Sequence, residues 1–338
     1  MSERVPLLQV RNLKQYFPIR GGVLGRVQKH VKAVDDISFD VYQGETMGIV
    51  GESGCGKSTT ARSILRLQEP TGGNVLFEGD DLTNLSRSEL RRKRKDMQII
   101  FQDPYASFNP RQTIRELLNE AMAIQKVIPR DRRRDRMVEL LEMVGLKAEH
   151  THRYPHEFSG GQRQRIGIAR ALSVDPKLII CDEAVSSLDV SVQAQVINLL
   201  KKLQRELGLT YLFVAHDLGV VRHISNRLIV MYLGQIAETG DTRSVFQRPQ
   251  HPYTRALLAS IPIPDPKQRQ TAAPLVGDVP SPIDPPAGCP FHTRCPFAFD
   301  RCVAERPPLY DVGRDQFAAC HLLENGPVDY SRLQPTRK

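Results

Sequence analysis

The chain has 338 residues, 40% of them hydrophobic and 25% charged, which is the composition of a globular protein of about two domains. No apolar run approaches the roughly 18 residues that a membrane-spanning helix needs, and residues 1–4 lack the apolar core of a secretory signal. We therefore expect a cytoplasmic protein that does any membrane work through partner proteins.

The 47 basic and 38 acidic residues leave a net charge of +9, and the excess gathers in residues 91–95 and 130–136. Such runs bind nucleic acid or anionic lipid headgroups in some proteins. No aromatic residue interleaves with the lysines and arginines here, which weakens the case for nucleic acid. We interpret both runs as solvated helix faces and predict no nucleic-acid partner.

The first chemical motif is a phosphate-binding loop. Residues 51–58 are GESGCGKS, which fits the pattern GxxxxGK[ST], and they follow a short apolar strand at 45–50 and precede a helix. Glycines let successive backbone N–H groups converge on phosphate oxygens at the positive end of that helix. In this pattern Lys57 reaches the β- and γ-phosphates of ATP and Ser58 binds Mg²⁺. The alternative interpretation is a glycine turn before an ordinary helix.

A glutamine follows the next predicted strand, which spans residues 97–101. At a strand end that faces a nucleotide, Gln102 would contact Mg²⁺ and the attacking water, although an ordinary loop glutamine explains it equally well. Beyond it, residues 111–148 are predicted to be helical, with one apolar side formed by Leu117, Leu118 and Met122.

A second anion site is predicted at the start of a later helix. Ser159, Gly160, Gly161 and Gln162 precede a helical pattern that ends before Asp175-Pro176. Ser159 is a good N-cap, and the glycines expose the N–H groups of the helix start. Capping alone explains the serine but does not explain the glycines and the glutamine.

Two carboxylates follow a buried strand. Residues 177–181 are a continuous apolar run of the kind found in parallel sheets, and Asp182 and Glu183 come directly after it. Ligands bind at the carboxyl ends of such strands. Asp182 would hold Mg²⁺, directly or through water, and Glu183 would polarise the attacking water as the general base.

An amphipathic helix and another buried strand come next. Residues 192–207 carry core leucines and valines at helical spacing, with Gly208 past the end: Val192, Val196, Leu199, Leu200, Leu203 and Leu207. The strand at 210–215 then ends at His216. A histidine at that position is predicted to sense the γ-phosphate, and the alternative is a structural histidine.

Taken together, these motifs resemble the ATP-binding subunit of an ABC transporter over residues 7 to 250. The resemblance implies an α/β fold: an ABC-type P-loop nucleotide-binding domain with a RecA-like core, a helical subdomain at about 103–172 and an antiparallel β-subdomain. It implies that Phe17, or its neighbour Tyr16, stacks on adenine, and that residues 186–189 form the D-loop. It also implies head-to-tail dimers in which each ATP lies between the Walker A loop of one subunit and the signature of the other.

The resemblance further implies which residues act at the nucleotide. Residues 158–162 resemble the signature, with Phe158 where leucine is usual. The implied catalytic residues are Lys57, Gln102, Glu183 and His216, and the implied Mg²⁺ ligands are Ser58, Gln102 and Asp182. The implied ATP-binding residues are Tyr16, Phe17, Gly51, Ser53, Gly54, Cys55, Gly56, Lys57, Ser58, Thr59, Ser159, Gly160, Gly161 and Gln162.

Three further strings resemble the oligopeptide/dipeptide and nickel importer branch of that family: residues 101–111, 154–157 and 251–258. That branch implies a second, usually different ATPase subunit, two membrane permease subunits and an extracytoplasmic peptide-binding protein. It implies a peripheral position at the cytoplasmic face of the membrane, with the loop after Gln102 as the contact to the permeases. Peptide is the expected cargo, and nickel or another small solute is the alternative.

The C-terminal region, residues 251–338, is predicted to be a separate extension. Residues 261–286 form a proline-rich linker, and four of the six cysteines then fall at Cys289, Cys295, Cys302 and Cys320. Disulfides are disfavoured in a reducing cytosol, and the spacing lacks CxxC pairs, so a [4Fe–4S] cluster is favoured. The resemblance to the oligopeptide/dipeptide and nickel importer branch also implies such a cluster, because similar tails in that branch carry one. Structural Zn²⁺, with His292 as a possible ligand, is the alternative, and Cys55 and Cys181 are expected to take no part.

Three rival functions are weighed against this hypothesis. ABC-type ATPases of DNA repair or chromosome maintenance insert long coiled coils or zinc modules between the first motif and the signature, whereas about a hundred residues separate them here. Translation-factor ATPases of this class carry two cassettes in one chain, whereas this sequence has a single phosphate-loop motif. A non-enzymatic scaffold is the third rival, and it would not turn over ATP.

Overall fold

The computed structural model describes residues 5–21, 26–103, 107–261, 277–330 and 333. By compactness the chain divides into two units, each built from several stretches of sequence. Unit 1 comprises residues 1–8, 41–46 and 77–215, and unit 2 comprises residues 9–40, 47–76 and 216–338. The predicted domain boundary after residue 250 stays a prediction. Parts of the predicted linker, the first four residues and positions 104–106 of the loop after Gln102 lie outside the described residues.

Unit 1 is built on three parallel strands in the order β8–β7–β6. These are β6 (Met97–Ile100), β7 (Leu178–Asp182) and β8 (Thr210–Val214), and every residue of β7 and β8 is buried. Ile100 lies opposite Cys181 and Asp182 lies opposite Val214. Because the strands are parallel and in register, their carboxyl ends meet at one edge of the sheet.

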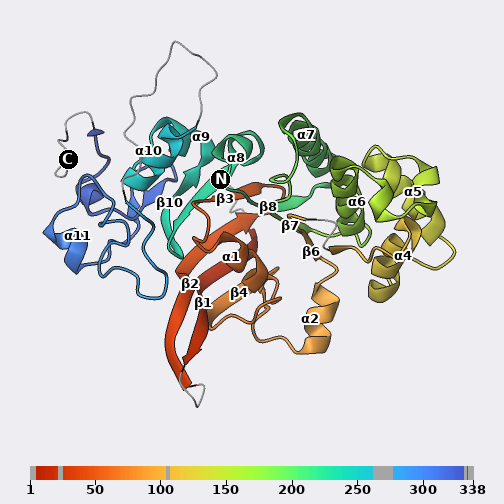
Figure 1. Cartoon of the computed structure of the whole chain (residues 1–338), viewed down its shortest axis with the longest axis horizontal. Coiled ribbons are helices and arrows are strands. Elements are labelled where there is room, and N and C mark those ends of the chain that lie inside the picture. Colours follow the sequence, from red (N-terminus) through yellow and green to blue (C-terminus); the bar gives the residue numbers. More distant parts are fainter. Residues whose placement is uncertain (1–4, 22–25, 104–106, 262–276, 331–332, 334–338) are drawn as a thin grey trace, which may run out of the picture. The chain divides into compact units, whose positions relative to one another are not determined.

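The helices of unit 1 are α2 (Arg87–Lys93), α4 (Ile114–Gln125), α5 (Arg133–Met143), α6 (Gly160–Leu172) and α7 (Val190–Leu207), with short elements β5 (Asp80–Asp81), η1 (Ala148–His152) and η2 (Pro155–Glu157). Figure 1 shows α4, α5 and α6 grouped together.

The helical stretch predicted at 111–148 is interrupted between α4 and α5. Lys126 adopts a left-handed conformation (φ 53°) that ends α4. Leu117, Leu118 and Met122 are buried on one side of α4, as predicted.

Helix α7 has the expected apolar face, except that Val192 is only half-buried and Leu207 is exposed. Leu200 is fully buried and Leu203 is 1% exposed, and Gly208 caps the helix in the left-handed conformation. Leu207, which the periodicity placed in the core, is 44% exposed, because it lies in the last turn of the helix.

Unit 2 contains strands from both ends of the chain. Strands β1 (Pro6–Gly21), β2 (Arg26–Tyr42) and β4 (Gly72–Phe77) are ordered β2–β1–β4. A second set contains β3 (Thr46–Val50), which pairs in parallel with β9 (Arg227–Tyr232), and β10 (Gln235–Asp241), which pairs antiparallel with β9. The remaining strands are β11 (Tyr310–Asp311) and β12 (Phe317–Ala318), and the helices are α1 (Lys57–Ile64), α8 (Leu218–Ile224), α9 (Thr242–Gln247), α10 (Pro252–Ala259), α11 (Asp300–Ala304) and η3 (His321–Leu323).

The C-terminal region extends the β10 edge of this sheet. Strand β12 pairs with β10 through Glu238 and Ala318, and the buried Glu238 carboxylate accepts the backbone N–H groups of Gln250 and His251. It also accepts the side-chain amide of Gln316, 2.6 Å away. Burial raises the pKa of Glu238, because a buried carboxylate loses its hydration. The hydrogen-bond donors offset part of this cost. The tail is thus hydrogen-bonded to the sheet of unit 2, which the sequence did not predict.

The described residues include no helix that combines the length and the apolar character needed to span a bilayer.

Replacing Leu200 by alanine should lower the free energy of unfolding by about 2–5 kcal/mol, because it leaves a cavity in the core. Leu207→Ala on the same helix should change it by less than about 0.5 kcal/mol. Urea unfolding followed by circular dichroism measures both variants. Equal losses would contradict the exposed position of Leu207.

Candidate functional site

The residues predicted to act at a nucleotide divide between the two units. Unit 2 holds the phosphate loop, the aromatic pair at 16–17 and His216, and unit 1 holds Gln102, the signature and the Asp182-Glu183 pair. Each group is described within its own unit.

The phosphate loop joins β3 to α1, and the start of α1 is left without a side-chain cap. Gly56 is the N-cap residue, in the left-handed conformation (φ 104°), and the first turn holds no acidic residue. By contrast, Ser86 and Glu89 form a capping box on α2, and Thr113 and Glu116 form one on α4. An uncapped helix N-terminus combines backbone N–H donors with the positive end of the helix dipole, and it is suited to bind a phosphate.

Glycine is required at two positions of the loop for steric reasons. A Cβ atom on Gly51 would come within 2.2 Å of the Met231 carbonyl oxygen, and one on Gly56 within 2.1 Å of the Ala33 carbonyl oxygen. Both glycines also have positive φ angles, 153° and 104°. The loop therefore keeps its shape only while these side chains are absent.

Lys57 is buried at the start of α1, and its ammonium is oriented by the loop. The Nζ atom donates to the carbonyl oxygens of Gly51 at 2.9 Å and Glu52 at 3.0 Å, and Cys55 Sγ lies 3.9 Å away. Burial raises the pKa of the Cys55 thiol, which keeps it neutral beside the ammonium. Ser58 and Thr59 follow in the first turn and are half-buried, and Ser53 is exposed.

The two aromatic candidates for adenine stacking are neighbours on β1 and differ in their contacts. The Tyr16 hydroxyl donates to the Asp35 carboxylate, and burial together with this bond raises the pKa of Tyr16. The ammonium of Lys32 lies 6.0 Å from the centre of the Tyr16 ring. Phe17 is half-buried. Both residues are half-buried, and the choice between them for adenine stacking stays a prediction.

The carboxyl edge of the unit 1 sheet brings together several predicted residues. Asp182 ends β7 and is 3% exposed. Gln102 follows β6, and its carbonyl accepts the Ser187 hydroxyl at 3.4 Å, which connects the two loops. Because β6 and β7 end at the same edge, Gln102 and the Asp182-Glu183 pair leave the sheet on the same side.

Glu183 holds a strained backbone conformation, with φ of 51°. Its N–H donates to the Val214 carbonyl at 3.0 Å, and its own carbonyl accepts the N–H and the hydroxyl of Ser186. The left-handed conformation costs a glutamate about 1–2 kcal/mol, and these bonds maintain it. Such strain is typical of positions where a side chain must point in one direction for function.

The signature residues have structural roles as well as the predicted one. Ser159 and Gln162 form a capping box: the Ser159 hydroxyl accepts the Gln162 N–H at 3.4 Å, and the Gln162 side chain accepts the Ser159 N–H at 3.1 Å. A Cβ atom on Gly161 would approach Val192 Cγ1 to 2.4 Å, so this glycine permits α6 to lie close to α7. Capping therefore explains Gln162 as well as Ser159, which corrects the expectation that the glutamine had no such explanation. Gly160 is exposed at the helix start.

His216 is exposed and follows the end of β8 after one residue, Ala215. The next residue, Asp217, caps α8 by accepting the N–H groups of Gly219 and Val220. His216 thus lies between a buried strand and a fixed helix start.

The four cysteines of the tail converge on one small cavity, which His292 and His321 also line. All four thiols are buried and none forms a disulfide. Burial raises the pKa of Cys289 to about 11, and burial together with the neighbouring cysteines raises the pKa of Cys320. Among the described residues, however, no group of three or more potential ligands is arranged to hold a metal ion.

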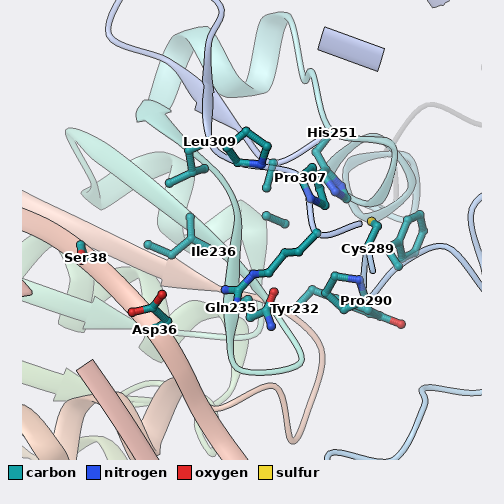
Figure 2. A pocket seen from close by; sticks show the side chains of 15 residues that line it. Asp36, Ser38, Tyr232, Gln235, Ile236, His251, Cys289, Pro290, Pro307 and Leu309 are labelled. Atoms are coloured by element: carbon teal, nitrogen blue, oxygen red, sulfur yellow. The ribbon is translucent and has the colours of Figure 1, made fainter. Parts of the chain in front are cut away.

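A larger cavity of about 350 Å³ lies beside this cysteine cluster. Figure 2 shows Asp36 and Ser38 at one end of it and Cys289 and Pro290 at the other, with Gln235 and Tyr232 between them. Cys289 lines both cavities, so the two adjoin within unit 2.

Arg294 and Tyr253 both contact Glu52 in the phosphate loop, and the sequence predicted none of these three residues for the site. Arg294 makes a paired contact with the Glu52 carboxylate, and the Glu52 N–H donates to the Tyr253 hydroxyl. Glu52 lies inside the motif but at one of its variable positions. The other two are far from it in sequence, so no local pattern indicates them.

Comparison with known protein families gives two matches along the chain. The ABC transporter family matches residues 34–186, and the family described as Oligopeptide/dipeptide transporter, C-terminal region, matches residues 237–302. The chain is 52% identical over 319 residues to the oligopeptide transport ATP-binding protein AppF of Bacillus subtilis (strain 168), covering 94% of this chain and 97% of that protein. It is 50% identical over 330 residues to the probable peptide ABC transporter ATP-binding protein y4tS of Sinorhizobium fredii, covering 98% and 93%.

A solved structure shares the fold. The dimeric, post-hydrolysis structure of the ATP-binding cassette MJ0796 bound to ADP and Pi is 29% identical, with a TM-score of 0.62, over 70% of this chain and 99% of that one. Together with the ABC transporter match, this likeness confirms the predicted fold class, an ABC-type nucleotide-binding domain of mixed α/β structure.

Gly56→Ala should lower the free energy of unfolding by about 3 kcal/mol, because its new Cβ overlaps the Ala33 carbonyl in an already left-handed backbone. Gly54→Ala is the matched control: φ is 79° there too, but no atom lies within 4 Å of the added carbon. The control should lose only about 1 kcal/mol. Thermal and urea unfolding compare the two, and equal losses would contradict the close packing at Gly56.

Proposed function

This chain belongs to the family of ABC transporter ATP-binding proteins, in its oligopeptide/dipeptide branch, and from that premise we propose how its residues act and with which partners. It is an ATPase, the ATP-hydrolysing subunit of an importer for peptides. One observation carries this conclusion: the relatives match the chain along almost its whole length. The match includes residues 237–302, which fit the family model for the C-terminal region of oligopeptide and dipeptide transporters.

The phosphate loop supplies the binding part of the reaction. The uncapped start of α1 offers N–H donors to the phosphates, and Lys57, held by two loop carbonyls, offers its ammonium to the β- and γ-phosphates. The proposed Mg²⁺ ligands are oxygens of Ser58, Gln102 and Asp182, which is the ligand type that this cation prefers. When bound, Mg²⁺ neutralises the charge that develops on the phosphate oxygens.

Glu183 is proposed as the general base. Its carboxylate would accept the proton of the attacking water as that water forms its bond to the γ-phosphorus and the bond to the β-γ bridging oxygen breaks. The strained backbone of Glu183 supports this role, because the fold maintains a costly conformation there. Gln102 is proposed to position the water and His216 to contact the γ-phosphate.

A dimer that sandwiches ATP is proposed for the working protein. The related cassette MJ0796 forms a dimer with ADP and Pi bound. Here the signature residues Ser159, Gly160, Gly161 and Gln162 would complete the site of a second, usually different, ATPase subunit. We propose two permease subunits as the membrane partners, an extracytoplasmic peptide-binding protein as the source of cargo, and a peripheral position at the cytoplasmic face.

Di- and oligopeptides are the proposed cargo, because the names of both relatives given above refer to peptide or oligopeptide transport. Nickel or another small solute is the second candidate, since the sequence strings of the two importer types are alike. In such systems the cargo binds to other chains, so the residues of this one do not discriminate between them.

A [4Fe–4S] cluster is proposed for the four tail cysteines. The thiols of Cys289, Cys295, Cys302 and Cys320 all line one cavity, are buried and are free of disulfides, which fits a cluster held by four thiolates. Structural Zn²⁺, with His292 from the same cavity as a possible ligand, is the alternative.

Glu183→Gln should reduce ATP turnover by a factor of about 100 to 10,000 while ATP binding is kept, because only proton acceptance is lost. Steady-state hydrolysis and equilibrium binding of ATP to the purified protein measure the two effects. Glu206→Gln, the same change on the exposed face of α7, is the control and should leave both unchanged. Unchanged turnover in Glu183→Gln would remove Glu183 as the base.

Cys295→Ser should remove iron and acid-labile sulfide from the protein and abolish a brown absorbance at about 400 nm. Cys181→Ala, which changes a cysteine of the β7 strand, should keep both. Metal analysis and the visible spectrum of each preparation decide the question. A colourless wild-type protein with stoichiometric zinc would favour the alternative metal.

A further inference from the structure

The cysteine-rich tail is joined to the phosphate loop by a partly buried ion pair. Arg294, which lies directly before Cys295, makes two parallel contacts with the Glu52 carboxylate, at 2.7 Å and 3.1 Å. The side chain of Arg294 is 5% exposed and that of Glu52 24%. A bidentate arginine–carboxylate pair of this kind fixes both distance and direction.

Glu52 in turn fixes the phosphate-binding lysine. Its backbone N–H donates to the Tyr253 hydroxyl at 2.9 Å, and its carbonyl oxygen accepts Lys57 Nζ at 3.0 Å. Glu52 is therefore held by Arg294 at its side chain and by Tyr253 at its N–H, while it orients Lys57 through its carbonyl. Any movement of Glu52 changes the direction of the lysine ammonium.

Arg294 itself is positioned by the segment that carries the cysteines. The Cys289 N–H donates to the Cys302 carbonyl at 2.8 Å, and the Arg294 N–H donates to the Phe291 carbonyl at 3.0 Å. The Phe291 ring packs on Tyr232 with centroids 5.3 Å apart and on Tyr253 with centroids 5.4 Å apart. This packing connects the cysteine loop to β9 and α10, the elements beside the phosphate loop.

We propose that the tail positions the ATP-binding loop: Arg294 holds Glu52, and through it Lys57, so that ATP affinity depends on the tail. Arg294 is a positioning residue, since it contacts the loop and not the nucleotide. The proposal rests on the ATPase function proposed above. It gives the cysteine-rich segment a part in nucleotide binding, whichever metal it holds.

The experiment is a double-mutant cycle on the full chain. Binding of a non-hydrolysable ATP analogue with Mg²⁺ is titrated for the wild type, Glu52→Gln, Arg294→Gln and the double variant. Each single change should weaken binding about tenfold, and the double variant should be no weaker than either, because both remove the same interaction. KM for ATP should rise with kcat at saturation unchanged.

Arg301→Gln is the matched control. Arg301 lies in the same segment, but it pairs with Glu305 and Glu324 on the surface, so its loss should leave ATP affinity unchanged. The iron and zinc contents of Arg294→Gln should equal those of the wild type, which shows that the tail is intact. Arg294→Lys, which keeps the charge but loses the paired geometry, should bind with intermediate affinity and serves if Arg294→Gln does not fold.

Wild-type affinity in Arg294→Gln, or losses that add up in the double variant, would overturn the proposal. Lys57→Ala distinguishes this failure from that of the function itself. If Lys57→Ala loses ATP while Arg294→Gln binds normally, only the role of the tail is wrong. If Lys57→Ala binds ATP as the wild type does, the ATP site itself is wrongly assigned and the role of the tail falls with it.

Discussion

Close backbone packing around the phosphate loop is the constraint on which unit 2 depends. The Met231 carbonyl of β9 and the Ala33 carbonyl of β2 lie where side chains at Gly51 and Gly56 would otherwise project. The Gly234 N–H, in the turn after β9, donates to the Cys55 carbonyl at 2.9 Å and secures the other side of the loop. The loop shape is therefore imposed by strands from distant parts of the chain as well as by its own glycines.

Two helix starts carry the predicted anion sites, and they satisfy their N–H groups differently. Helix α1 begins without a side-chain cap, so no capping side chain lies between its first N–H groups, at the positive end of the helix dipole, and a ligand of the loop. Helix α6 begins with a complete capping box of Ser159 and Gln162, so part of its donor capacity is used within the chain. The first start is built to bind an anion, and the second is stable without one.

Each unit carries one costly or long-range arrangement at residues proposed to act on ATP. Glu183 is kept in a left-handed conformation by its bonds to Val214 and Ser186, at a local cost that the buried strands β7 and β8 offset. The tail, in turn, is hydrogen-bonded to the buried Glu238 and reaches the loop through Arg294. The composition of the tail indicates only a proline-rich extension. In the structure the tail contacts Glu52, the residue whose carbonyl accepts the Lys57 ammonium.

The sequence alone determined the family, the fold class and the order of the main elements, because these follow from local patterns: a glycine-rich loop between an apolar strand and a helix, and carboxylates after a buried run. Those patterns placed β3, α1, β7 and β8 where the structure has them. Local periodicity failed where position within an element matters, as at the exposed Leu207 in the last turn of α7. Only the tertiary structure decided the capping role of Gln162, the strain at Glu183 and the pairing of Glu52 with Arg294, 242 residues away, since contacts between distant residues leave no local signal.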